Sequence, residues 1–61
     1  MKDMKNTRIG KEVVFTDYGK TYTGKIIAQR EYETGVFWFD IETKDERVFN
    51  VPIRNIQKIK F

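Results

Sequence analysis

The sequence predicts an all-β fold, a small and partly open barrel of five strands with a 3₁₀ turn before the last one. Aromatic and β-branched residues are frequent, and turn signals recur at spacings of roughly 8 to 15 residues. No window of adequate length shows the apolar stripe of an amphipathic helix. A small sheet that nearly closes into a barrel also protects its edges from pairing with other chains.

The first strand is expected over residues 9–16. Alternation places Ile9, Val13 and Phe15 on one face of this strand, which we expect to be buried. A turn follows, in which Gly19 can adopt a positive φ.

The second strand is expected to be long, over about residues 21–31, with Tyr22 facing the core. Two small residues, Gly24 and Ala28, indicate a close approach of another chain segment or a bend in a tightly curved sheet.

Residues 36–43 are expected to form the third strand, and its two faces differ. The inward face is wholly apolar and consists of Phe37, Phe39 and Ile41. Because the strand period is two, Trp38 must point the other way, together with two acidic residues. We therefore expect Trp38 to be partly exposed and to contact a partner. The alternative is that its ring packs across the sheet against Ile27 or Val48.

The last two strands are expected to be short. The fourth covers residues 47–51, and Pro52 should end its ladder because proline has no backbone N–H. Residues 52–56 are long enough for one 3₁₀ turn. The fifth strand covers residues 57–61, with its two apolar side chains on one face.

The length predicts one small unit. We expect residues 1–8 to form a flexible N-terminal segment and residues 9–61 to form a single domain. A domain of this size buries only about 60% of the surface that its unfolded chain exposes. Because such a domain has no room for a deep substrate cavity, we expect a binding module and not an enzyme.

The composition excludes several kinds of chemistry. The chain has no Cys and no His, which rules out disulfides, thiolate chemistry, the usual zinc sites and the commonest general acid–base side chain. No phosphate-cradling glycine motif or nucleophile–base pair is recognisable. We expect no catalytic residue, no metal site and no cofactor. Lack of Cys and of long apolar stretches predicts a soluble, cytoplasmic protein without membrane contact.

The formal net charge is +3, and its distribution is more informative than its sum. Residues 1–30 carry seven bases against three acids, a net charge of +4. Residues 31–46 carry six acids against one base, a net charge of −5, and residues 47–61 carry four bases and no acid. Such blocks point to association with a partner, and the alternative is an ordinary solvated surface.

The two basic blocks are expected to form one face, because the first and last strands are neighbours in small barrels. This face predicts association with DNA or RNA through phosphate contacts, with Trp38 as a stacking residue. The residues expected to bind nucleic acid are Lys11, Lys25, Arg54, Lys58 and Lys60. The alternative is that lysines on edge strands only block aggregation.

Two other kinds of partner are left open by the sequence. A protein-interaction module or inhibitory adaptor would use the acidic segment 31–46. The residues expected to contact a protein partner are Tyr18, Trp38, Asp40 and Glu42. A second copy of the chain is the other candidate, and it would pair through an edge strand to form a homodimer.

The order of these features resembles that of Src-homology-3-like barrels. The stretch "VPIRNIQKI" is similar to the point where such domains end a strand in Val-Pro or Ile-Pro, make a 3₁₀ turn and resume. "VFTDY" resembles the stretch that opens their peptide-binding loop. The first loop is too short for a signalling domain of this family, and Thr16 and Asn55 replace two groove tyrosines. The groove positions that the chain does match are Tyr18, Trp38 and Pro52.

The short first hairpin, "YGKTYTGKI", is closer to the Tudor, KOW and chromo-like branch of these barrels. Resemblance to Tudor domains implies an aromatic cage for methylated ligands, built here from Tyr18, Tyr22 and Trp38. Resemblance to KOW-type barrels implies nucleic-acid or ribosomal partners. The plasmid-encoded, barrel-type dihydrofolate reductase has a similar outline, but "VFNV" at residues 48–51 departs from its Val-Gln-Ile-Tyr signature.

Overall fold

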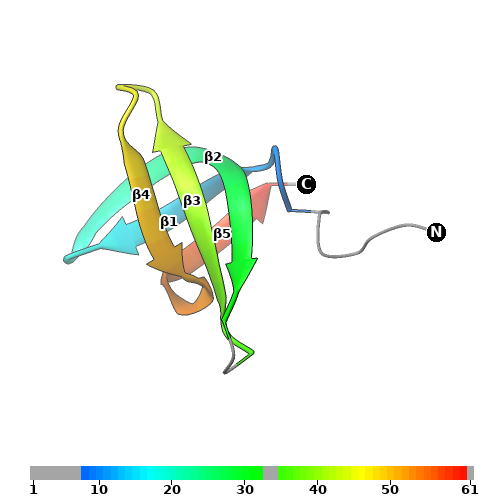
Figure 1. Cartoon of the computed structure of the whole chain (residues 1–61). Coiled ribbons are helices and arrows are strands. Elements are labelled where there is room, and N and C mark those ends of the chain that lie inside the picture. The colour runs from blue at the N-terminus through cyan, green and yellow to red at the C-terminus, as the bar shows by residue number, and fades with distance from the viewer. Residues whose placement is uncertain (1–7, 33–34, 61) are drawn as a thin grey trace.

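The structure is a computed structural model that describes residues 8–32 and 35–60. In these residues, five β-strands and one short 3₁₀ helix follow one another (Figure 1). The elements are β1 (Glu12–Asp17), β2 (Lys20–Glu31), β3 (Phe37–Thr43), β4 (Val48–Pro52), η2 (Ile53–Asn55) and β5 (Ile56–Lys60). The prediction of an all-β chain with a 3₁₀ turn before its last strand is confirmed.

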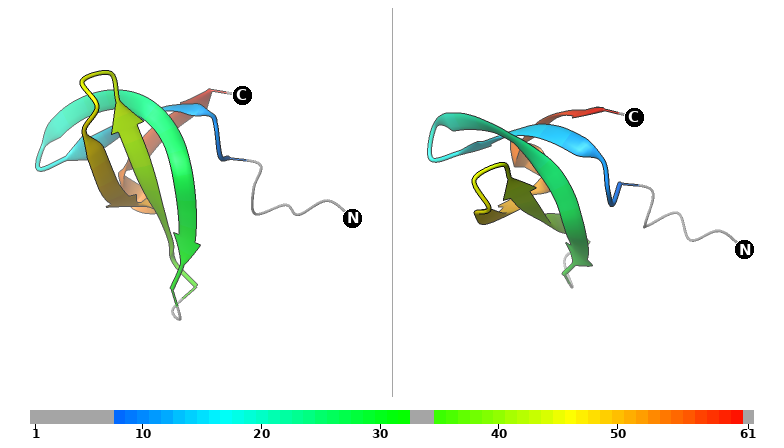
Figure 2. Two further views of the ribbon diagram at one scale, coloured as in Figure 1. Left: turned by 45° about the horizontal axis from the view of Figure 1, so that its top comes forward. Right: turned by 90° about the horizontal axis from the view of Figure 1, so that it is seen from above.

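All five strands belong to one antiparallel sheet in the order β4-β3-β2-β1-β5. The first and last strands are neighbours, as expected. Within the described residues β4 and β5 do not pair, so the sheet is not closed into a barrel and these two strands form its edges. Figure 2 shows that the long β2 curves strongly, so that β1 and β5 lie across from β3 and β4.

The largest error of the prediction lies at the start of β1. The chain turns at residues 8–10, where Gly10 has a φ of 91°. Ile9 is therefore 40% exposed and does not share the buried face of Val13. Of the predicted N-terminal segment 1–8, only Arg8 lies within the described residues, and the last residue expected in β5, Phe61, lies outside them.

β4 ends at Pro52, as expected, but Pro52 itself is the last paired residue of the ladder. Thr43 N–H donates to the Arg47 C=O at 2.9 Å, so hydrogen-bonded and non-hydrogen-bonded pairs alternate from there along β3 and β4. This alternation puts Pro52, opposite Trp38, at a non-hydrogen-bonded position. The β3–β4 ladder therefore loses no bond to the missing N–H of Pro52.

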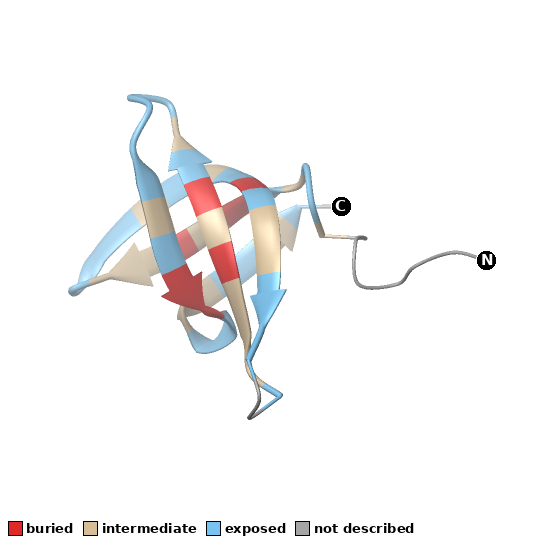
Figure 3. Cartoon of the chain, viewed as in Figure 1, coloured by how far each residue is buried: buried red, intermediate tan, exposed pale blue. Residues whose placement is uncertain are grey.

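The core lies on the inner face of the curved sheet and is wholly apolar (Figure 3). Its fully buried side chains are Val13, Phe15, Ile26, Phe39, Ile41 and Val51. Tyr22 packs on this core as predicted, with its ring centroid 4.7 Å from that of Phe49. Two arginines cover aromatic rings at its margins: the Arg8 guanidinium lies 5.6 Å from the Phe37 ring centroid and that of Arg47 lies 5.1 Å from the Phe49 centroid.

At Gly24, β2 leaves no room for a side chain beside β3. It pairs with Val13 of β1 and with Thr43 of β3, so both neighbours of β2 meet there. A Cβ at this position would lie 2.7 Å from the Glu42 carbonyl oxygen and 2.7 Å from Ile41 Cγ2. The predicted close approach at Gly24 is confirmed, and only glycine permits it.

The second small residue marks a bulge. The β2–β3 register shifts between Ile26 and Ala28, which leaves Ile27 on the outer face, 43% exposed. A bulge of this kind increases the local twist and bend of a strand. Beyond it, Gln29 faces the inner side opposite Phe39, and its Oε1 is buried without a hydrogen-bond partner in the described part of the chain.

We expect Gly24→Ala to lower the free energy of unfolding by about 1–3 kcal/mol, because the added methyl meets β3 backbone that would have to move. Urea unfolding followed by circular dichroism measures this change. Thr23→Ala, at the neighbouring exposed position, is the control and should cost less than about 1 kcal/mol. Equal losses in the two variants would show that β2 does not need the close approach.

We expect Gln29→Met to raise the free energy of unfolding by about 1 kcal/mol, because it keeps the side-chain length and removes a buried, unpaired acceptor. The same urea titration reports it. Gln57→Met, at an exposed position of β5, is the matched control and should leave stability nearly unchanged. A clear loss of stability in Gln29→Met would contradict the unpaired state of this amide.

Candidate functional site

A row of alternating charges crosses the outer face of the sheet, the face opposite the core. The register pairs Lys60 of β5 with Glu12 of β1. It also pairs Glu12 with Lys25 of β2, and Lys25 with Glu42 of β3. Lys60 Nζ lies 3.6 Å from Glu12 Oε1. Two of the bases predicted to bind nucleic acid, Lys25 and Lys60, therefore stand beside carboxylates that attract them.

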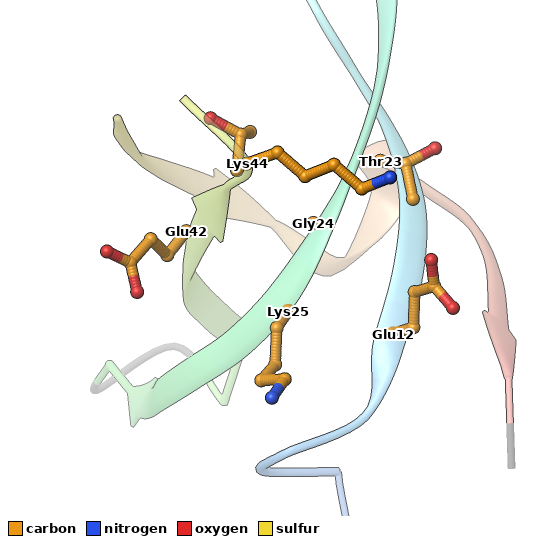
Figure 4. A pocket seen from close by; sticks show the side chains of 7 residues that line it. Glu12, Thr23, Gly24, Lys25, Glu42 and Lys44 are labelled. Atoms are coloured by element: carbon orange, nitrogen blue, oxygen red, sulfur yellow. The ribbon is translucent and has the colours of Figure 1, made fainter. Parts of the chain in front are cut away.

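A shallow, open hollow lies where this row crosses β2 (Figure 4). The residues that line it are Glu12, Thr23, Gly24, Lys25, Glu42, Thr43 and Lys44. Lys44 reaches from the end of β3 toward Thr23, while the Glu42 carboxylate points away from the hollow. Because both signs of charge surround an open depression, it does not form a preorganised site for an anion or a cation.

The other predicted bases do not complete one continuous basic face. Lys58 is exposed on β5 opposite Val14, and Arg54 is exposed on η2. Lys11 is half-buried just before β1, where its C=O accepts a hydrogen bond from Ile26 N–H at 3.0 Å. The adjacency of β1 and β5 was expected to join the two basic blocks, but the β1 residues that pair with Lys60 and Lys58 are Glu12 and Val14.

Trp38 is half-buried on the outer face, so its predicted partial exposure is confirmed. Its register partners are Arg30 of β2 and Pro52 of β4, in place of the expected alternatives Ile27 and Val48. Trp38 therefore lies near the end of the β2–β3–β4 ladder, close to where η2 begins.

Tyr32 supports the Trp38 ring, and the sequence-based prediction missed it. The two ring centroids lie 6.0 Å apart with an interplanar angle of 85°, an edge-to-face contact. Tyr32 N–H donates to the Val36 C=O at 3.2 Å and Tyr32 C=O accepts from Gly35 N–H at 2.8 Å, which brings Tyr32 back beside the start of β3. The signal that could have found it is the expected turn between the second and third strands.

Asp40 joins three strands next to the aromatic pair. Its Oδ2 accepts a hydrogen bond from Arg30 Nη2 at 3.0 Å, and its Oδ1 accepts one from Asn50 Nδ2 at 2.8 Å. The bond from Arg30 and the negative charge of Asp40 raise the pKa of Arg30 above its usual value. Since the Asp40 side chain is only 16% exposed and both of its oxygens are paired, it positions Arg30 and Asn50 and is not a free contact for a partner.

These residues form one connected surface, which we call the Trp38 surface. Its members are Arg30, Tyr32, Trp38, Asp40 and Asn50. It combines a half-exposed aromatic pair with a hydrogen-bonded polar trio whose geometry is set by three paired strands.

Two residues predicted to contact a partner lie outside this surface. Tyr18 has a φ of 51° and is 98% exposed in the β1–β2 turn, at the opposite end of β2 from Arg30. Glu42 lies on the same face of β3 as Trp38 and Asp40, but in the row of alternating charges. The aromatic cage implied by the Tudor resemblance is not assembled either, because Tyr22 packs on the core.

The acidic hairpin between β3 and β4 is held by its own hydrogen bonds. Asp45 accepts one bond from the Thr43 hydroxyl and another from Arg47 Nε at 2.8 Å. The bond from Thr43, followed by the positive charge of Arg47, lowers the pKa of Asp45 below its usual value. An exposed carboxylate of this kind is ionised at neutral pH and is unsuited to act as a general acid.

Metal binding and membrane crossing have no support in residues 8–32 and 35–60. No three acidic side chains there are grouped closely enough to hold a metal ion. No helix in the same ranges has the length and apolarity that a membrane crossing requires. Comparisons with protein-family models, with curated proteins and with solved structures gave no significant match to this chain.

We expect Thr43→Val to raise the pKa of Asp45 toward its usual value, because the variant removes the largest of the interactions that lower it. Any stability that ionised Asp45 contributes is present above its unfolded pKa and is lost as the pH falls through its folded pKa. In Thr43→Val this loss should occur at higher pH. NMR titration of the Asp45 carboxyl carbon measures the shift, with Thr23→Val as control. An unchanged midpoint would refute the role of the Thr43 hydroxyl.

Proposed function

We propose that the chain is a small, non-enzymatic protein-interaction module that binds its partner through the Trp38 surface. The observation that carries this proposal is the half-buried Trp38 ring braced by Tyr32 at a centroid distance of 6.0 Å. Large aromatic side chains that are held in place offer contact area with little conformational entropy left to lose on binding. Such residues dominate the binding energy of many protein interfaces.

The chain segment that supplies both aromatic residues is acidic, although Arg30 neutralises Asp40 within the surface itself. Trp38 and Tyr32 belong to the segment 31–46, which has a net charge of −5. Since opposite potentials favour association and like potentials oppose it, the partner is expected to present a basic segment. The same field disfavours a phosphate backbone as the ligand of the aromatic pair.

Nucleic-acid association is the second candidate function. It is favoured by Arg54 and Lys58, which are exposed and make no ion pair with another described residue. Phosphate contacts from these bases would give a salt-dependent affinity. The carboxylates of Glu12 and Glu42, in register with Lys25, weaken this candidate.

We also propose that the open sheet is a Src-homology-3-like fold of the short-loop type. The support is the strand order, the neighbouring first and last strands, and η2 placed directly after Pro52 and before β5. The proposed place of function is the cytoplasm, since a chain without Cys needs no disulfide and is compatible with a reducing compartment.

The test is affinity capture from a lysate of the encoding organism, with and without nuclease. We expect a protein partner that survives nuclease treatment and is lost with Trp38→Ala and with Tyr32→Ala. Because Tyr32 is 47% exposed, its truncation should leave the fold intact, which circular dichroism checks. Lys58→Ala, on the far edge of the sheet, is the control and should retain the partner.

Two outcomes would contradict the proposal. A partner that disappears with nuclease and with Lys58→Ala would support nucleic-acid association in its place. A protein partner that is retained by both aromatic variants would show that the contact lies elsewhere.

A further inference from the structure

The two edges of the sheet differ in charge. On β5, Lys58 and Lys60 alternate with apolar Ile59. β4 carries no charged residue between Val48 and Pro52. Lysine on an edge strand prevents pairing with another chain, and an uncharged edge lacks this protection. β4 is therefore the edge open to an added strand.

The hydrogen-bond alternation shows which groups β4 offers. The bonded pair of Thr43 and Arg47 makes Phe49 and Val51 the residues of β4 that bond to β3. The backbone N–H and C=O of Val48 and Asn50 therefore point away from β3, toward the open side. The side chains of these two residues both lie on the outer face.

The same reasoning shows why β5 is a poor partner for this edge. Ile26 N–H donates to the Lys11 C=O at 3.0 Å, and alternation from that pair turns the N–H and C=O of Glu12 toward β5 and its partner Lys60. The outward backbone groups of β5 then belong to Ile59, whose side chain packs on the core. If β4 of one copy paired antiparallel with β5 of another, Val48 or Asn50, on the outer face of the first copy, would lie opposite Ile59, which faces the core of the second. The cores of the two copies would then lie on opposite sides of the joined sheet.

We propose that β4 pairs antiparallel with β4 of a second copy of the chain, about a two-fold axis at Phe49. In this register Val48 of each copy lies opposite Asn50 of the other, so every outward N–H and C=O of these residues finds a partner. The outer faces of the copies are continuous, no charged side chain of either β4 opposes another, and the Pro52 nitrogen is not needed. Pairing also covers Val48, which is 57% exposed. Isologous pairing of this kind closes at a dimer.

The dimer does not depend on the proposed function, but it has a consequence for it. Continuity of the outer face places both Trp38 surfaces on the same side of the joined sheet. A partner that carries two binding segments would then bind more tightly, because after the first segment binds, the second is held at a high effective concentration near the other Trp38 surface.

The test is sedimentation velocity over a wide range of protein concentration, combined with NMR amide exchange. We expect the mass to approach twice that of the chain as concentration rises. Exchange of the Val48 and Asn50 amides should slow in parallel, while Phe49 and Val51, already bonded to β3, serve as references.

Variants separate edge pairing from other association. Val48→Pro removes an outward N–H at the first residue of the strand without removing a β3–β4 bond, and it should abolish the dimer. Val48→Lys places a charge on the edge and should do the same, which covers the case in which the proline variant does not fold. Val48→Thr keeps the N–H and should still dimerise, as should Lys58→Ala. A mass that stays monomeric for the unmodified chain, or a dimer that persists in Val48→Lys, would overturn the proposal.

Discussion

The close contact of β2 with β3 at Gly24 decides how the whole sheet is folded. β2 pairs with β1 through its first half and with β3 through its second half, and the two ladders overlap at Gly24 and Lys25. Because a Cβ at Gly24 would lie 2.7 Å from the Glu42 carbonyl, the strand can bend over β3 only with glycine there. This bend folds one sheet over a core of six fully buried side chains without closing it.

Once β2 is bent, the register decides what each charged side chain can do. The bases of β2 and β5 meet carboxylates across the outer face, which breaks up the basic face that the net charge indicated. At the other end of β2, the same ladder brings Arg30 to Asp40 and fixes Trp38 between Arg30 and Pro52. The net charge along the chain thus predicted a basic face for nucleic acid, and the carboxylates paired across the strands partly neutralise it.

Much of the fold follows from local patterns. The alternation of side chains along a strand correctly placed Trp38 and Phe39 on opposite faces of the sheet. The glycine at position 24 correctly indicated that another segment of the chain lies close to β2 there. The sequence-based prediction fails where a turn, or a contact between different segments of the chain, overrides the alternation of apolar and polar residues along one strand. Ile9 alternates with Val13, yet a turn at Gly10 removes it from the strand. Asn50 joined the candidate site by pairing across from β4, and Tyr32 joined it through the turn that follows β2; spacing along one strand reveals neither.

The most direct test of the account is a map of the surface that the captured protein partner touches. Two-dimensional ¹H–¹⁵N NMR of the labelled chain, recorded as the partner is added, resolves the single Trp38 indole N–H, the Asn50 side-chain amide and the backbone amides of η2 and β5. We predict that the Trp38 and Asn50 side-chain signals shift together while those of Arg54 and Lys58 stay in place. Shifts confined to Arg54 and Lys58, with an unchanged Trp38 indole, would contradict it.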